Sequence, residues 1–394
     1  MTYRLPAEWE PQDFVLLTWP NETTDWAPYL EEIRQTVAEM VRAIARHEEV
    51  MLLSMFKTDV PDELREMPNV YVAELPNNDT WARDFGPIVL KSTQPADSAA
   101  DGEGAADDEE EEKDYLWLDF RFNGWGEKFQ AAWDNMIPYK LWALYGFFED
   151  TDYEDHQDFV LEGGSIEADG RGTLFTTSQC LLAPHRNQPL TKEQIEEQLK
   201  RRLRVGRVVW LDYGNLVGDD TDGHIDTIVR CAPDDTLVYV GCDDPADEQY
   251  ADFHALEEQL KALRTADGKP YRLLRLPMPE RICDCVEVQC DDVAVQSACG
   301  AVQCSEAAVQ EVQGGQSLSG VQEVQGERLP ATYANFLVIN GAVLVPTYDQ
   351  PEKDAEALRV VQQAFPDREM IPIDARTIIR QHGSVHCLTM QVPK

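Results

Sequence analysis

Short apolar runs and segments with helical periodicity alternate along most of the chain. Val15–Trp19 is an apolar run that predicts a strand, and Pro20 ends it. From Leu30 to Ile44, apolar residues recur three and four positions apart, which predicts an amphipathic helix. Further strands are predicted at 50–54, 70–75 and 115–120.

A unit of hairpin, helix and strand then recurs. Asp169, Gly170 and Gly172 predict a turn between strands at 159–162 and 173–177, and Asn340-Gly341 predicts a second hairpin between 336–339 and 342–345. The other predicted elements are strands at 224–231, 237–242, 272–276 and 385–392 and helices at 248–263 and 354–365. Repetition of this unit without a long-range parallel-sheet pattern indicates an α/β fold of small modules in a ring, with functional loops facing a common axis.

Two segments interrupt this pattern. Residues 97–112 are small and acidic, so we expect a disordered loop there. Residues 282–327 are rich in Gln, Val, Gly and Ser and repeat a Val-Gln pair, which indicates an insertion. Outside these segments, we interpret residues 1–394 as a single catalytic domain.

The charge of the chain limits its partners. It has 73 acidic and 34 basic residues, a net charge of −39, and this repels nucleic acid and anionic membranes. Its 43% hydrophobic residues are enough to build a core. Arginine outnumbers lysine, and such an acidic surface is typical of a protein kept soluble in high salt. The same charge could also attract a cationic small molecule.

The nine cysteines do not indicate a secreted disulfide scaffold, because no signal-peptide pattern opens the chain. We therefore expect a reduced, cytoplasmic protein, and no apolar run is long enough for a membrane helix. The second segment holds five cysteines at positions 283, 285, 290, 299 and 304. They lack the paired knuckles of a metal site, so we expect solvated thiols there, and metal binding is the alternative.

Four separated segments carry candidate chemistry. Cys387 lies on a polar approach to the predicted last strand, as either a nucleophile or a buried structural thiol. His386 would point to the opposite face of that strand, whereas His224 and Asp226, two residues apart, would share a face. Asp84 has an aromatic, Gly-Pro setting that favours partial desolvation.

Glu162 completes the candidate set. It follows an apolar strand and precedes two glycines, a setting suited to orienting a neighbouring histidine.

Four motifs resemble, in order, those of the agmatine deiminase family. They are Trp81–Pro87, Leu161–Ser165, Gly223–Asp226 and Val385–Cys387. The family belongs to the guanidine-modifying pentein superfamily, together with bacterial peptidylarginine deiminases. The resemblance runs from Leu5 to the C-terminus outside the two insertions. The usual ending Gly-Gly-Gly-Asn-Ile-His-Cys differs here, where His382-Gly383-Ser384 precedes Val385.

The resemblance implies a fold and roles for these residues. The fold would be a five-bladed α/β propeller of ββαβ modules around a central active site. Cys387 would be the nucleophile, His224 the general acid and base, and Glu162 its support. The substrate-binding residues would be Asp84 and Asp226 for the guanidinium, with Trp81, Asp220, Asp222 and Asn335 around the ligand. No metal or organic cofactor is expected.

The expected reaction is hydrolysis of agmatine to N-carbamoylputrescine and ammonia in polyamine biosynthesis, through an amidino-cysteine. The expected ligand is thus a cationic guanidine. The sequence leaves open whether the chain forms a homo-oligomer. The alternative substrate is free or peptide-linked arginine. A cysteine peptidase would leave Asp84 and Asp226 without a task, and a non-catalytic pentein would not need every catalytic position filled.

Overall fold

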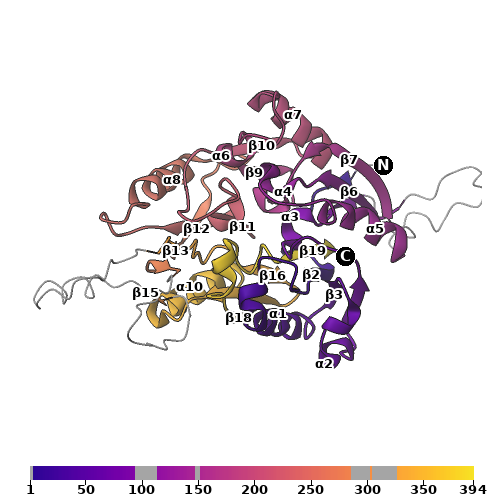
Figure 1. Cartoon of the computed structure of the whole chain (residues 1–394). Helices are drawn as coiled ribbons and strands as arrows, with labels where there is room; N and C mark the ends of the chain where they lie inside the picture. Colours follow the sequence, from indigo (N-terminus) through magenta and orange to yellow (C-terminus); the bar gives the residue numbers. More distant parts are fainter. Residues whose placement is uncertain (1–2, 94–112, 147–150, 285–301, 304–325) are drawn as a thin grey trace, which may run out of the picture.

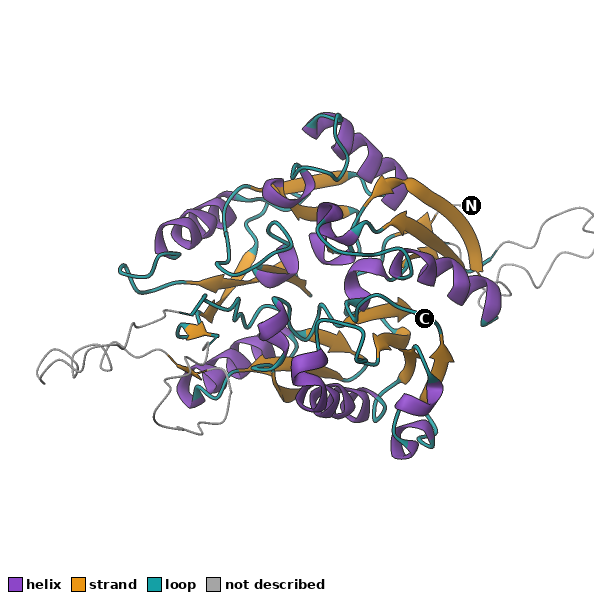
Figure 2. Cartoon of the chain, in the orientation of Figure 1, coloured by secondary structure: helices purple, strands orange, loops and turns teal. Residues whose placement is uncertain are grey.

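The computed structural model describes residues 3–93, 113–146, 151–284, 302–303 and 326–394. The segment 97–112 and most of 282–327, both predicted as insertions, lie outside the described residues. The described chain has a mixed α/β fold (Figure 1). Its strands lie inside, and the longer helices lie around them (Figure 2).

Five sheets share one arrangement, in which an antiparallel pair of strands is extended by a parallel strand. Sheet by sheet, the strands are β1 (Tyr3–Arg4), β5 (Ile88–Ser92), β6 (Tyr115–Arg121) and β7 (Thr151–Val160); β8 (Ile166–Ala168), β9 (Thr173–Thr177) and β10 (Arg207–Leu211); β11 (Val229–Ala232), β12 (Thr236–Gly241) and β13 (Arg272–Pro277); β16 (Leu337–Ile339), β17 (Ala342–Thr347) and β18 (Glu369–Asp374); β19 (Thr389–Pro393), β2 (Gln12–Thr18), β3 (Glu49–Ser54) and β4 (Val70–Glu74). The predicted repeat of hairpin, helix and strand therefore ends each time in a parallel pair, which the sequence pattern did not show.

Helices connect the parallel strands, except α3, which lies between β4 and β5 of two different sheets. They are α1 (Leu30–Ile44), α2 (Asp62–Arg65), α3 (Ala82–Phe85), α4 (Gly124–Glu127), α5 (Ile137–Leu144), α6 (Ser178–Leu181), α7 (Lys192–Leu203), α8 (Tyr250–Ala262) and α10 (Pro351–Ala364). Short 3₁₀ helices lie at 27–29, 57–59, 134–136, 163–165, 225–227 and 378–381. The bounds predicted for α1 are confirmed. Its apolar stripe, including Ile33, Val37 and Val41, is buried, as expected for an amphipathic helix.

The two ends of the chain meet in one sheet. β19 pairs antiparallel with β2, so that Thr389 lies opposite Leu17 (indigo and yellow in Figure 1). The backbone N–H of Arg83 in α3 donates to the carbonyl of Cys387, just before β19, at 3.2 Å. The sheet thus brings the C-terminal cysteine next to the first of the predicted motifs.

Three predicted strands are placed differently. The hairpin partner of β9 is β8, Ile166–Ala168, and 159–162 instead covers the end of β7 and the residues after it. The last strand begins at Thr389, so that His386 and Cys387 lie in the turn before it.

The third correction affects the site. β11 begins at Val229, and His224 precedes the 3₁₀ helix Ile225–Thr227. The N–H of His224 donates to Thr221 Oγ1 at 3.1 Å, and Thr227 Oγ1 donates to the carbonyl of His224 at 2.8 Å. These local bonds compete with strand formation. His224 and Asp226 therefore do not share the face of a strand.

The second insertion starts within the folded part. Ile282–Cys283 forms β14, which pairs with β15 at Val302–Gln303, and Cys283 is buried. The prediction of a solvated thiol is wrong for Cys283, and the other four cysteines of the segment lie outside the described residues. Among the helices described, none is long and apolar enough to cross a membrane.

Candidate active site

A cavity of about 150 Å³ lies where five separate segments meet, around residues 25, 79–84, 125–129, 220–221 and 381–387. Cys387 lines it together with four aspartates, Asp25, Asp79, Asp84 and Asp220. Trp81 and Trp125 contribute aromatic walls. No Lys or Arg lines this cavity in the described part of the chain, so its wall is suited to a cation.

Gly164 marks the point on which three of the predicted residues converge. A Cβ atom placed on Gly164 would lie 2.6 Å from His224 Nδ1, 2.9 Å from Asp84 Oδ1 and 3.1 Å from Asp226 Oδ2. Only glycine allows the backbone to approach these side chains so closely. The structure therefore brings Asp84, His224 and Asp226 together, although they come from different elements.

Cys387 is buried beside this cluster. Its Sγ atom lies 3.6 Å from Asp226 Oδ2, and its backbone N–H donates to Asn335 Oδ1 at 3.2 Å. Burial raises the pKa of the Cys387 thiol, and the charges of Asp226 and Asp84 raise it further, well above its ordinary value. The thiol is therefore protonated when the carboxylates have no cation between them.

Asp226 is fixed by a residue that the sequence analysis set aside. His386 Nδ1 donates to Asp226 Oδ2 at 2.8 Å, and Asp226 Oδ1 has no hydrogen-bond partner among the described residues. Burial alone would raise the pKa of Asp226, but the bond and charge of His386 and the charges of His224 and Arg230 together outweigh it and lower the pKa. Asp226 thus keeps its charge and has one oxygen available for a ligand.

Asp84 faces the same point from α3. Its Oδ2 accepts a hydrogen bond from Trp125 Nε1 at 2.9 Å, and its Oδ1 accepts one from the N–H of Gly164 at 3.0 Å. Burial raises the pKa of Asp84 to about 6, although His224 opposes the rise. A cation bound beside Asp84 would therefore stabilise the ionised form of its carboxylate.

His224 is fully buried between two carboxylates. Its Nδ1 lies 3.6 Å from Asp84 Oδ1 and its Nε2 lies 3.8 Å from Glu162 Oε2, distances too long for hydrogen bonds. Burial lowers the pKa of His224, but the charge of Asp84 and the neighbouring Cys180 and Glu162 side chains together outweigh it and hold the pKa well above its ordinary value. Neither ring nitrogen has a hydrogen-bond partner among the described residues, so the imidazole can exchange protons with a ligand.

Glu162 is held by an arginine that the sequence analysis missed. Arg186 Nε donates to both carboxylate oxygens of Glu162 at 3.1 Å. Burial opposes the ionisation of Glu162, but the charges and hydrogen bonds of Arg186 and His224 together outweigh it, and the pKa of Glu162 is lowered to about 2. Glu162 is thus a permanent anion next to His224, in agreement with a supporting position.

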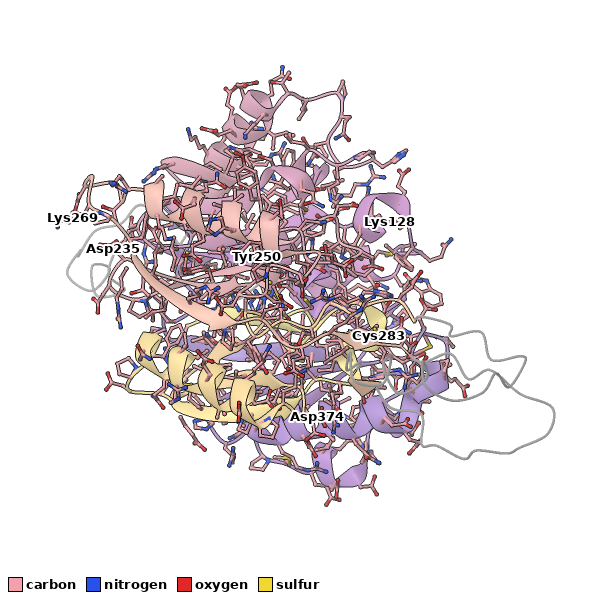
Figure 3. All side chains as sticks on the ribbon, turned by 90° about the vertical axis from the view of Figure 1, so that its left-hand side faces the viewer. Lys128, Asp235, Tyr250, Lys269, Cys283 and Asp374 are labelled. Atoms are coloured by element: carbon pink, nitrogen blue, oxygen red, sulfur yellow. The ribbon has the colours of Figure 1, made fainter. Side chains whose placement is uncertain are left out.

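Two of the residues expected around the ligand have other partners. The carboxylate of Asp222 forms ion pairs with Arg186 at 2.7 Å and with Lys128, labelled in Figure 3, at 2.9 Å. Asn335 Oδ1 accepts the backbone N–H groups of His386 and Cys387, so Asn335 positions the turn of the nucleophile. Neither is among the residues that line this cavity, and the same holds for Glu162, His224 and Asp226.

Other cavity residues gave no signal in the sequence. In a chain with 73 acidic residues, Asp25 and Asp79 are not distinguishable from surface aspartates. Burial raises the pKa of Asp79 to about 7. Trp125 gave no signal either, and only the structure shows its bond to Asp84.

Two groups of side chains have the ligand types of a metal site. Glu162, Cys180 and His224 bring their ligand atoms within 4.8 Å of one another, as do Glu8, Glu167 and His386. The guanidinium of Arg186 is bound to Glu162, and that of Arg230 to Glu8 and Glu167. These arginines already neutralise the carboxylates, so the arrangement suits charge pairing better than a metal ion.

Comparison with known proteins places the chain in a family. The model of the Porphyromonas-type peptidyl-arginine deiminase family matches residues 4–393. The chain belongs to this family, and the resemblance predicted from its motifs is confirmed.

Three relatives show how far the likeness extends. A Porphyromonas gingivalis protein of known structure, provisionally assigned as an arginine deiminase, is 41% identical, with a TM-score of 0.77, over 100% of this chain and 99% of its own. The agmatine deiminase of C. jejuni, solved with substrate bound, is 32% identical, with a TM-score of 0.78, over 100% and 97%. A curated agmatine deiminase of Pseudomonas putida is 32% identical over 99% of this chain and 95% of its own.

Proposed function

We propose that the chain is an agmatine deiminase that hydrolyses agmatine to N-carbamoylputrescine and ammonia, as a step of polyamine biosynthesis. One observation carries the proposal: the buried thiol of Cys387 lies 3.6 Å from Asp226 Oδ2, where Asp84, His224 and Asp226 converge on Gly164. The agmatine deiminases of C. jejuni and Pseudomonas putida, similar over almost their whole length, support the same substrate.

The two carboxylates suit a guanidinium. This group is planar, charged near neutrality and carries a fork of N–H donors that carboxylates accept in pairs. Asp226 Oδ1 has no other partner among the described residues, and each oxygen of Asp84 accepts one bond. A guanidinium between Asp84 and Asp226 adds a positive charge next to Cys387, which favours the thiolate.

The reaction then needs only groups already in place. When the guanidinium binds, the Cys387 S–H bond breaks and its proton is released to solvent. The thiolate then attacks the guanidinium carbon, and a C–S bond forms. The C–N bond to the departing amino group breaks, and protonated His224 supplies the proton for ammonia. His224 next deprotonates a water molecule, which attacks the amidino carbon. The C–O bond forms, the C–S bond breaks, and the urea-type product leaves with the thiolate restored.

The cavity favours agmatine over arginine. Agmatine ends in an ammonium, which Asp220 can accept, whereas arginine ends in an α-amino acid whose carboxylate needs a cationic clamp. The described lining provides four aspartates and neither Lys nor Arg. An unpaired carboxylate in such a cavity is strongly disfavoured, and free or peptide-linked arginine is therefore the second candidate only.

The same proposal includes the architecture. The five sheets of like topology correspond to five ββαβ modules, and we infer a five-bladed propeller that forms one catalytic domain over residues 1–394. The site residues lie in turns and short helices at the ends of strands, as loops facing a common axis would place them. A reducing cytoplasm suits an enzyme that depends on a free thiol.

Ammonia release under competition between agmatine and arginine tests the substrate. Ionic strength is matched and high, because an acidic surface of this kind is typical of a protein kept soluble in high salt. We expect kcat/KM for agmatine to exceed that for arginine by at least ~10³, since the carboxylate of arginine would stay unpaired. A preference for arginine, or for an arginyl peptide assayed alongside, contradicts the assignment of agmatine while sparing the deiminase chemistry.

A further inference from the structure

His382 is a cavity residue to which the proposed reaction gives no task. It lines the same wall as Cys387, but it is half-buried, whereas Cys387 is only 3% exposed. Asp220, also half-buried, lies on the same cavity. Burial thus decreases from Cys387 towards His382 and Asp220, which places these two residues where the tail of a ligand held at Cys387 would extend.

The hydrogen bonding of His382 defines which ring atom can meet a ligand. His382 Nδ1 lies 2.7 Å from the carbonyl oxygen of Gly218. A carbonyl can only accept, so Nδ1 carries a proton and donates it. The neutral ring then has its lone pair on Nε2, which has no hydrogen-bond partner among the described residues.

The backbone fixes where His382 lies. Its φ is 65°, in the left-handed region, where it is the C-cap residue of the 3₁₀ helix at 378–381. The next residue, Gly383, packs directly on Trp81, because a Cβ there would lie 2.2 Å from the indole ring. The imidazole is therefore held on the cavity wall by the end of a helix on one side and by the Trp81 contact on the other.

We propose that His382 is a specificity-determining residue, whose Nε2 accepts a hydrogen bond from the cationic tail of the substrate beside Asp220. This inference rests on the proposed function, because it assumes that the guanidinium is bound at Cys387. It extends that function by giving the ammonium two acceptors, one charged and one neutral. An ammonium has three N–H donors, so both bonds can form together.

Acidic groups predominate around His382. Asp219 and Asp220 lie on the loop that His382 contacts, Asp25, Asp79 and Asp84 line the cavity, and Lys128 donates to the backbone of Asp220. These surroundings suit a cationic tail beside His382.

Two substrates isolate the tail. Agmatine and butylguanidine share the guanidinium and the four-carbon chain, but butylguanidine lacks the amine. Replacing His382→Gly removes the ring and relieves the left-handed backbone, so the variant should fold. We expect kcat/KM for agmatine to fall at least ~10-fold through KM, as for loss of a hydrogen bond to a charged group, and that for butylguanidine to change less than ~2-fold.

A matched control is His185→Gly. His185 has φ 62°, is exposed and does not line the cavity, so this variant should leave the ratio of the two specificity constants unchanged.

Each other result is decisive. An unchanged ratio in His382→Gly, or an equal loss of kcat on both substrates, overturns the role of His382 and indicates an effect on the turn of Cys387. If the wild-type protein releases ammonia from neither substrate, the proposed function fails and this inference fails with it.

Discussion

We propose Cys387 as the nucleophile, and its thiol is protonated until a cation binds beside it. Burial and the charges of Asp226 and Asp84 hold the pKa of Cys387 well above its ordinary value, and burial raises that of Asp84 to about 6. A guanidinium placed between the carboxylates reverses the electrostatic part of both shifts. The cation that is to be attacked therefore activates the thiol. While no cation is bound, the protonated thiol reacts slowly with other electrophiles.

Removing either carboxylate tests this coupling. Asp84→Asn and Asp226→Asn keep the shape of the side chain but lose the charge that faces the guanidinium. Each should lower kcat/KM by at least ~100-fold, about 2.7 kcal/mol, as for a buried hydrogen bond to a charged group. Asp243→Asn is the control, because Asp243 is an exposed partner of Arg275. Losses below ~10-fold at Asp84 and Asp226 contradict their role in binding.

The pH dependence tests the charge of Asp84 separately. Its pKa in the folded protein is about 6, above the ordinary 3.8, so the carboxylate is protonated below that pH and cannot bind a cation. We expect kcat/KM for agmatine to fall as the pH decreases through about 6. The folded state binds this proton more tightly than the unfolded state. The contribution of Asp84 to the free energy of unfolding therefore decreases as the pH rises from 3.8 to about 6. A rate independent of pH between 5 and 7 is incompatible with this account.

At the scale of elements, the sequence predicted regular structure better than the site. The strand at 15–19 and helix α1 follow from apolar periodicity, because burial of one face determines them. Asp84, His224 and Cys387 lie instead in a short helix and in turns, which hydrogen bonds from distant residues fix. The motifs identified these residues by resemblance, but no local pattern showed that Asn335 binds the Cys387 turn.

His386 illustrates the same limit. We predicted that His386 points away from Cys387. In the structure, His386 Nδ1 donates to Asp226 Oδ2, the oxygen that lies next to Cys387 Sγ. On its other side, His386 Nε2 lies 2.8 Å from Glu8 Oε1, which belongs to the N-terminal segment. A histidine in the C-terminal turn thus connects the first residues of the fold with the carboxylate of the active site.

We expect His386 to act as a positioning residue. His386→Ala removes the donor to Asp226 and should lower kcat/KM by ~10- to 100-fold, in line with a hydrogen bond to a charged group. His386→Asn keeps an N–H donor near the position of Nδ1 and should recover most of that loss, with similar unfolding temperatures for both variants. If His386→Asn is as inactive as His386→Ala, the hydrogen bond to Asp226 does not explain the loss of activity, and the positioning role of His386 is contradicted.

At the scale of the whole molecule, the active site depends on closure of the chain. β19 from the C-terminus pairs with β2 from the N-terminus, and the bond from Arg83 to the carbonyl of Cys387 joins the two regions. The site residues range from Asp25 to Cys387, so that no contiguous part of the sequence contains the chemistry. A net charge of −39 surrounds this centre and favours cationic ligands over anionic ones.

The central claim is that Cys387 carries the substrate during turnover. The direct measurement is the intact mass of the protein, quenched in acid while it turns over agmatine, followed by mapping of the modified peptide. We predict an adduct on Cys387 with the mass of agmatine less ammonia, and neither adduct nor ammonia release in Cys387→Ala, which should remain folded. Turnover of agmatine by Cys387→Ala, or an adduct at another residue, would contradict the account.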